Sequence, residues 1–383
     1  MTGFDFACVP RMISGDGQTL RLAEQLARLG VARPFVVTDR GLMDAGVLTE
    51  PLRSLVDAGL APVVWADVQA DPPEGSIIAA IAAARAAGAD GVIGLGGGSS
   101  LDTAKLVALL ARTGQPLAEI YGIGLAHGPR LPLVQVPTTA GTGSEVTPIA
   151  IVTTAGDEKK GVVSPHLYAD VAILDATLTV GLPPRVTAMT GVDAMVHAIE
   201  AYTSRRLKNV MSDALAHGAL ALLSANIRAV IADGGNLAAR RAMLEGSTLA
   251  GMAFANAPVA AVHALAYPLG GRFHVPHGLS NALVLIPVLE FNAPLAGALY
   301  AELAHDLPAD CMAGGDRSAR GFIDAMAALV HSMPFEQRLR DVGVSEADLP
   351  MLATDAMAVQ RLLVNNPRDV SYDDVLALYR AAL

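Results

Sequence analysis

The stretch GVIGLGGGSSLDTAK (residues 91–105) predicts a buried strand, a glycine turn and the start of a helix. Ser99 followed by Asp102 has capping-box spacing, which predicts where that helix begins. The partial positive charge of a helix N-terminus favours phosphate there. The spacing of these glycines departs from the Rossmann GxGxxG pattern, so an ordinary turn without a phosphate-binding role remains the alternative. Three residues without a Cβ let their backbone N–H groups approach a pyrophosphate: Gly96, Gly97 and Gly98.

Around this stretch, short strand-like and helical segments alternate over about the first 180 residues. Amphipathic helices are predicted at 18–30 and 75–88. The alternation predicts a parallel sheet covered on both faces, as in α/β nucleotide-binding domains. The predicted strands are 33–39, 61–68, 89–96, 131–137, 150–154 and 171–175.

Beyond Pro183-Pro184 the pattern becomes helical, with almost no strand signal. Two prolines neither continue a strand nor sit inside a helix, so they mark a domain boundary. We expect an NAD-binding α/β domain over 1–182 and an all-helical domain over 183–383, with the active site in the cleft between them. Helices are predicted at 212–231, 239–257 and 371–383.

A second polar loop, PTTAGTGSEVTP (137–148), leaves a predicted strand. Its hydroxyl groups can hold phosphate, ribose or carboxamide groups, and they belong to Thr138, Thr139, Thr142 and Ser144. An ordinary surface loop is the alternative. Asp39 ends the strand at 33–39, where a carboxylate can accept from both ribose hydroxyls and repel a 2′-phosphate. That role predicts NAD rather than NADP, whereas a helix or turn cap is the alternative.

One aspartate and three histidines are candidates for a metal site. Asp193 and His197 are four residues apart, so a helix places both on one face. His263 and His277 are separated by an apolar helix, a predicted stop at Gly270-Gly271 and a short loop. A carboxylate and three imidazoles suit a divalent transition metal and leave room for a substrate oxygen. Structural roles for these histidines are the alternative.

Composition narrows the class of protein. The chain has 383 residues, enough for two domains, and a formal charge of −10, which argues against a nucleic-acid partner. Two cysteines and the lack of a signal-peptide pattern favour a reducing, cytoplasmic setting. The most membrane-like segment, 249–271, contains Asn256, Pro258 and His263, so we expect a buried core helix and no membrane partner.

Four motifs in this order resemble the iron-containing (group III) alcohol dehydrogenase family: GGGSSLDTAK, PTTAGTGSE, GVDAMVHAIEAY and HALAYPLGGRFHVPHG. The likeness extends over residues 5–380. It implies a Rossmann-like N-terminal domain, an all-helical C-terminal domain and a fold related to dehydroquinate synthase. It also implies a homodimer, NAD as cofactor and Fe²⁺ as metal, with Zn²⁺ or another divalent ion as a possible substitute.

The resemblance also implies roles for individual residues. The family's metal ligands fall on Asp193, His197, His263 and His277. Its cofactor-binding positions fall on Asp39, Gly96, Gly97, Gly98, Ser99, Thr138, Thr139, Thr142, Ser144 and, near the cofactor ribose, Lys160.

One position departs from the family pattern. Many members carry a second histidine one turn after the third ligand, thought to relay the substrate proton, and here that position is Tyr267. A tyrosine hydroxyl donates readily at neutral pH but is a poor resting base. Tyr267 is therefore the catalytic candidate, as in branches that handle hydroxy acids. Nearby Arg272 can pair with a substrate carboxylate or be a solvated surface residue, whereas His274 is not a family ligand.

These features predict an NAD- and metal-dependent oxidoreductase that interconverts a small alcohol, such as the ω-hydroxy acid 4-hydroxybutyrate, and its aldehyde or ketone. Maleylacetate reductase-like or hydroxyacid–oxoacid transhydrogenase activity is the alternative on the same scaffold. A lyase of the dehydroquinate synthase type would need several basic residues near the motifs, and few are present. A non-catalytic NAD-binding oligomer is opposed by the intact set of ligand types.

Overall fold

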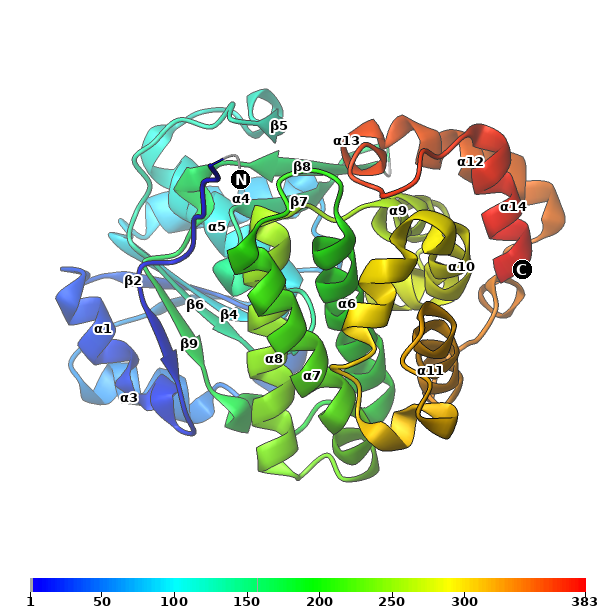
Figure 1. Cartoon of the computed structure of the whole chain (residues 1–383). Coiled ribbons are helices and arrows are strands. Elements are labelled where there is room, and N and C mark those ends of the chain that lie inside the picture. The colour runs from blue at the N-terminus through cyan, green and yellow to red at the C-terminus, as the bar shows by residue number, and fades with distance from the viewer. Residues whose placement is uncertain (1–2, 157) are drawn as a thin grey trace. The chain divides into compact units, whose positions relative to one another are not determined.

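The computed structural model describes residues 3–156 and 158–383, which form two compact units. One unit is Cys8–Gly181. The other is Leu182–Leu383 together with the N-terminal residues up to Ala7. The first is an α/β unit and the second is helical (Figure 1), which confirms the predicted fold class.

The α/β unit is built on a six-stranded sheet whose strand order is β1-β9-β6-β4-β2-β3. Every neighbouring pair in it is parallel, as strand–helix alternation predicts. The apolar run at 91–96 became β4, buried on both faces in the middle of the sheet. The strands are β1 Met12–Ser14, β2 Pro34–Val37, β3 Val63–Trp65, β4 Gly91–Gly96, β6 Leu133–Pro137 and β9 Val171–Leu174.

Helices cover both faces of this sheet (Figure 1). The helices are α1 Leu22–Arg28, α2 Arg40–Asp44, α3 Thr49–Asp57, α4 Glu74–Ala86 and α5 Gly98–Thr113. Leu22 and Leu26 of α1 and Leu55 of α3 pack on Ile93 and Val134 of the central strands, and all five side chains are buried. This packing removes apolar surface from water and fixes the strand ends from which the polar loops leave.

The segment predicted as a strand at 150–154 does form one, but outside the main sheet. It is β7 (Ile149–Thr153), which pairs antiparallel with β8 (Lys159–Val163) in a three-stranded sheet completed by β5 (Gly122–Ile123). Strands β1, β5 and β8 carry no local strand pattern, because they are short or contain polar residues and are defined by their pairing partners.

The second unit contains helices only, among the residues described. Helix α6 packs against α7, α8 and α10, and α9 packs against α10 and α12 (Figure 1). The helices are α6 Pro184–Thr203, α7 Val210–Ala232, α8 Leu237–Asn256, α9 Ala261–Phe273, α10 His277–Leu303, α11 Ala319–His331, α12 Leu349–Ala358, α13 Gln360–Leu363 and α14 Tyr372–Ala382.

The prediction of one core helix over 249–271 was wrong. The chain breaks between Asn256 and Ala261, and α8 and α9 meet there at 105°. By length and composition, α7 and α10 are apolar enough to cross a membrane, and α8 with α9 would be a third span if counted together. In the structure α7 and α10 pack against other helices of their own unit.

Candidate functional site

The four metal candidates come together in the helical unit. Asp193 and His197 lie one turn apart on α6, His263 lies in the first turn of α9, and His277 is the first residue of α10. One ligand atom from each lies within 4.8 Å of those of the other three. His277 is partly exposed, whereas the other three side chains are at most 4% exposed. The cluster is therefore buried with one open side.

Glu200, also on α6, sets the orientation of one ligand. Its Oε2 lies 2.6 Å from Nδ1 of His263, and its Oε1 accepts the backbone N–H of Val262 at 2.7 Å. The carboxylate requires a proton on Nδ1, which leaves the lone pair of Nε2 directed into the cluster. Glu200 thus satisfies the N-terminus of α9 and fixes the tautomer that a metal ligand needs.

Asn281, one turn after His277 on α10, also faces the cluster. Its Nδ2 donates to Oδ1 of Asp193 at 2.6 Å and lies 3.2 and 3.3 Å from Nε2 of His263 and His277. Among the residues described, its Oδ1 is buried without a hydrogen-bond partner. A buried polar atom of this kind beside convergent lone pairs is the environment of an ion site.

The electrostatics of the cluster favour the protonation states of metal ligands. Burial alone would raise the pKa of Asp193, but the three neighbouring imidazoles and the amide of Asn281 hold that pKa below its ordinary value. Burial lowers the pKa of His263 well below its ordinary value, and burial raises the pKa of Glu200 to about 7. An ionised aspartate and a neutral His263 imidazole fit a divalent transition-metal ion.

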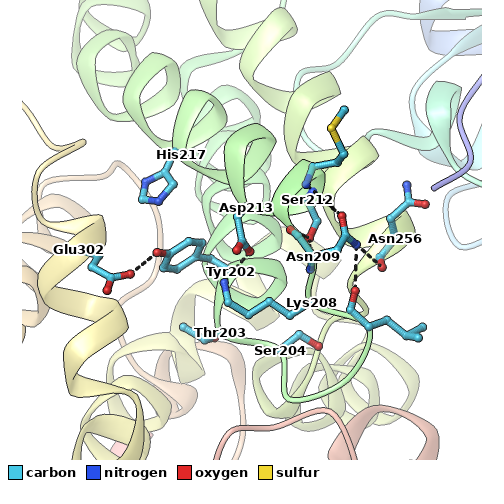
Figure 2. A network of polar contacts seen from close by, with 12 residues as sticks. Tyr202, Thr203, Ser204, Lys208, Asn209, Ser212, Asp213, His217, Asn256 and Glu302 are labelled. Carbon is cyan, nitrogen blue, oxygen red and sulfur yellow. Dashed lines mark hydrogen bonds and ion pairs between the residues drawn. The ribbon is translucent and has the colours of Figure 1, made fainter. Parts of the chain in front are cut away.

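The break between α8 and α9 places His263 beside α6. Two side chains from other segments hold the backbone of the break. Ser204 Oγ donates to the carbonyl of Pro258 at 2.8 Å, and Asn365 Nδ2 donates to the carbonyl of Val259 at 3.0 Å. Asn209 caps α7 and also donates to the carbonyl of Asn256 at the end of α8 (Figure 2). These bonds fix the direction in which α9 leaves the break.

The end of α6 is held by a second group of contacts in the same network (Figure 2). The hydroxyl of Tyr202 donates to Glu302 on α10. Lys208 Nζ lies 3.6 Å from the centre of the Tyr202 ring and pairs with Asp213 on α7. Helices α6, α7 and α10 are thereby tied together close to the turn that follows the ligand-bearing part of α6.

One detail of the predicted α9 region was wrong. The helix does not stop at Gly270-Gly271 but continues to Phe273. His274 ends it in a left-handed conformation with φ of 53°, so this residue shapes the turn, and Pro276 precedes the first turn of α10. The turn is what brings His277 back to His263, whose ring centre lies 5.3 Å from its own.

In the α/β unit, the two polar loops predicted to bind the cofactor lie against each other. The backbone N–H of Thr138 donates to the carbonyl of Gly96 at 3.0 Å. A Cβ added at Gly98 would lie 2.8 Å from Cγ2 of Thr142, so the close approach requires glycine. Helix α5 begins at Gly98, and its N-terminus can therefore face an anion at this junction.

The predicted capping box of Ser99 and Asp102 was wrong. Gly97 is the N-cap of α5 and makes no side-chain cap. The carboxylate of Asp102 instead accepts from Ser144 Oγ at 2.6 Å and from the backbone N–H of Ile151 at 2.9 Å. The hydroxyl of Ser144 is therefore bound to the protein, and Asp102 ties α5 to the second loop.

Lys105 strengthens this connection. Its side chain is fully buried, and Nζ donates to Ser144 Oγ at 2.7 Å, to Thr147 Oγ1 at 3.2 Å and to the carbonyl of Ile149 at 2.6 Å. Burial lowers the pKa of Lys105, opposed by the negative charge of Asp102. Lys105 stood in the quoted motif, but sequence reasoning gave it no role because its partners are about 40 residues away.

The remaining cofactor candidates lie in the same unit. Asp39 caps α2 by accepting from the backbone N–H of Leu42 at 3.0 Å through Oδ1, the helix-cap alternative, and a ribose role stays a prediction. Thr138 is buried, whereas Thr139 and Ser99 are partly exposed. Lys160 lies on β8 with Nζ 3.5 Å from Glu158 Oε2, so its role near the ribose also stays a prediction.

Comparison with known proteins agrees with these motifs. Residues 10–176 match the family described as iron-containing alcohol dehydrogenase, and residues 187–383 match the C-terminal domain of the Fe-containing alcohol dehydrogenase family. The chain belongs to the iron-containing alcohol dehydrogenase family. It is an alcohol/aldehyde oxidoreductase that uses NAD and a metal, as predicted.

Three relatives of this dehydrogenase illustrate its neighbours. It is 41% identical over 378 residues to sulfoacetaldehyde reductase of Bilophila wadsworthia, covering 97% of each chain. A crystal structure of a 1,3-propanediol oxidoreductase matches with a TM-score of 0.94, 34% identity and full coverage of both chains. The structure of sulfoacetaldehyde reductase from Bifidobacterium kashiwanohense in complex with NAD⁺ matches with a TM-score of 0.90 and 27% identity, covering 100% of this chain and 99% of that one.

Around the ligands, the dehydrogenase differs from the sequence-based picture of substrate contacts. Arg272 donates from Nε to Asp355 at 2.8 Å, so the arginine proposed for a substrate carboxylate already has an acidic partner. Arg361 of α13 donates instead to the hydroxyl of Tyr267 at 3.2 Å. Sequence reasoning missed Arg361 because no local motif surrounds it. The ring of Tyr267 lies 6.0 Å from that of His277, so this tyrosine borders the cluster.

Proposed function

We propose that the dehydrogenase holds its divalent metal with four side chains and transfers a hydride between NAD and a small alcohol or aldehyde. The proposed ligands are Asp193, His197, His263 and His277. The observation that carries the proposal is the convergence of their donor atoms within 4.8 Å in a largely buried cluster. Iron is the expected ion, and another divalent ion of similar ligand preference can replace it.

When bound, the metal polarises the substrate oxygen as a Lewis acid, and NAD accepts or returns the hydride. The protein's own residues prepare the site. Glu200 keeps the proton of His263 on Nδ1, and Asp193 supplies the negative charge that balances the ion. His197 is stacked between Phe254 and His263, at 4.4 and 4.7 Å between ring centres, which keeps water from its buried side.

The α/β unit supplies the cofactor contacts in this proposal. The pyrophosphate binds at the N-terminus of α5, where backbone N–H groups of Gly97, Gly98 and Ser99 are oriented by the helix. Thr138, Thr139 and Thr142 of the second loop contact the remaining phosphate and nicotinamide groups. Ser144 contributes by holding this loop on Asp102, and Asp39 favours NAD.

The finer proposal is a substrate with an acidic end group, such as the ω-hydroxy acid 4-hydroxybutyrate and its semialdehyde. Two of the similar proteins are named sulfoacetaldehyde reductases, and sulfoacetaldehyde is a short aldehyde with an anionic group. Its reduction is the same hydride transfer to a carbonyl.

A ligand variant with a matched control tests the assignment. His263→Ala should lose bound metal and metal-dependent NADH formation while keeping its affinity for NADH, because His263 lies in the helical unit. His331→Ala, which removes an exposed histidine of α11, should behave as wild type. Metal content is measured by elemental analysis and turnover by NADH absorbance. Wild-type turnover in His263→Ala, or full activity of the wild type in excess chelator, would defeat the proposal.

A further inference from the structure

Arg361 presents a cationic group beside the metal-ligand cluster. Its Nη2 donates to the hydroxyl of Tyr267 at 3.2 Å, and its guanidinium carbon lies 5.6 Å from the centre of that ring. Within residues 3–156 and 158–383, no carboxylate pairs with this guanidinium. A guanidinium has five N–H donors, so most of them remain available to another acceptor.

The position of Arg361 is defined by Tyr267. Tyr267 lies four residues after His263 on α9, on the same face of that helix, and its ring contacts the open side formed by His277. Tyr267 therefore links the guanidinium of Arg361 to the open side of the cluster.

Arg272, the other arginine near this motif, does not meet these conditions. It lies in the last turn of α9, and although both arginines are exposed, the Nε of Arg272 bonds to Asp355 of α12. An anionic substrate would have to compete with that carboxylate for Arg272. Arg361 instead donates to the hydroxyl of Tyr267, which is not a carboxylate, so an anion could bind the other N–H groups of the guanidinium while this hydrogen bond is kept.

We propose that Arg361 binds a negatively charged end group, a carboxylate or a sulfonate, of a short aldehyde or alcohol whose oxygen is at the metal cluster. This inference rests on the proposed function of that cluster. Arg361 makes the anion contact, and Tyr267 is a positioning residue that holds the guanidinium toward the site. A planar guanidinium matches the two oxygens of a carboxylate or sulfonate better than a lysine ammonium does.

The test compares charged and uncharged aldehydes of similar length. The rate of NADH oxidation is measured with butanal, succinic semialdehyde and sulfoacetaldehyde. In Arg361→Ala, kcat/KM for the two anionic aldehydes should fall about 10- to 100-fold, mainly through KM, whereas butanal should change less than about twofold. Arg361→Lys should recover part of the loss. The carboxylate and sulfonate arms show which end group is preferred.

Two further arginine variants exclude simpler explanations. Arg320→Gln removes an exposed, paired charge on α11 and controls for net charge, so it should leave all three aldehydes unchanged. Arg272→Gln tests the rival contact: a selective loss of anionic substrates there and not in Arg361→Ala would overturn the inference. Tyr267→Phe should weaken anionic substrates without moving the pH profile for butanal, and a moved profile would instead give Tyr267 a proton-transfer role and contradict positioning.

A binding measurement separates this inference from the proposed function. Butyrate and ethanesulfonate are titrated by calorimetry into the NADH-bound enzyme, where both should bind at least about tenfold more weakly to Arg361→Ala and more weakly at high salt. Lack of turnover with every aldehyde would contradict the proposed function. Turnover with butanal, but equal losses for charged and uncharged aldehydes in Arg361→Ala, would overturn the role of Arg361 alone.

Discussion

Replacing Glu200 with glutamine turns the carboxylate that contacts His263 into a carboxamide of nearly the same volume. Glu200 is 4% exposed and has one oxygen for each of two donors, Nδ1–H of His263 at 2.6 Å and the backbone N–H of Val262 at 2.7 Å. Glutamine offers one acceptor oxygen and one NH₂ group. If the oxygen serves Val262, the NH₂ faces His263 and favours a proton on Nε2, the atom directed at the cluster.

Either orientation of the glutamine costs metal affinity. Loss of a carboxylate partner behind a ligating histidine typically weakens metal binding 10- to 100-fold, which corresponds to about 1.4–2.7 kcal/mol. Glu200 and His263 are both buried and form a short hydrogen bond of 2.6 Å, so we expect the loss of metal affinity in Glu200→Gln to fall within this range. NADH affinity should be unchanged, because the cofactor loops belong to the α/β unit.

The assay uses metal-stripped protein reloaded with Co²⁺ or Zn²⁺ in competition with a chelator of known affinity. The visible absorption of bound Co²⁺ reports ligand geometry independently of turnover. Glu290→Gln is the matched control, since Glu290 is an exposed residue of α10 that pairs with Arg320. Metal affinity of Glu200→Gln within about twofold of wild type, with an unchanged Co²⁺ spectrum, would refute the role assigned to Glu200.

Two predictions concern the α/β unit. Asp39→Ser should raise kcat/KM with NADP relative to NAD by about tenfold or more, because the carboxylate that repels a 2′-phosphate is removed. The serine hydroxyl can still cap α2, so stability should change by less than about 0.5 kcal/mol. An unchanged cofactor ratio from NADH and NADPH kinetics would exclude the ribose role. Asp175 is buried and accepts from Gly17 N, Thr19 N and the hydroxyls of Thr19 and Thr177. Burial raises its pKa, but these hydrogen bonds outweigh burial and leave the pKa below its ordinary value. A lowered folded-state pKa stabilises the protein above the unfolded pKa, about 4, and this contribution is lost as pH falls through the folded pKa. Asp175→Asn should therefore lower the free energy of unfolding by about 2–3 kcal/mol at pH 7, with a smaller difference at pH 3 in urea titrations, and an equal difference at both pH values would contradict this reasoning.

The main sheet could be predicted, apart from β1, because its other strands are mostly apolar. The strand expected at 89–96 is β4 at Gly91–Gly96, and that at 131–137 is β6 at Leu133–Pro137. Both are central and covered on two faces, so nearly all of their residues are apolar, with Gln135 of β6 as the buried polar exception. β8, with the sequence KKGVV, has no such pattern and becomes a strand only by pairing with β7 and β5.

Helix boundaries in the second unit were set by tertiary contacts that no local pattern contains. The break after Asn256 lies in an alanine-rich segment, and Ser204 and Asn365 hold it from elsewhere in the chain. Gly270-Gly271 reads as a stop in an isolated helix, since glycine costs about 1 kcal/mol there. Packing of α9 on α10 and α12 outweighs that cost and carries the helix to Phe273.

Some residues of the site could be found from local sequence spacing, whereas others are brought in from distant parts of the chain. The α6 pair could be found from helical spacing, and Glu200 follows seven residues after Asp193 on the same face, a signal that becomes useful only once His263 is known to lie opposite. Arg361 is 94 residues from Tyr267 and has no motif around it. Proximity in sequence therefore favoured Arg272, although its guanidinium is directed to Asp355. An arginine can bind a substrate anion only if its N–H donors are not already used by a carboxylate of the protein. Which arginine meets this condition depends on how the fold pairs the charged side chains, and distance along the chain does not reveal it.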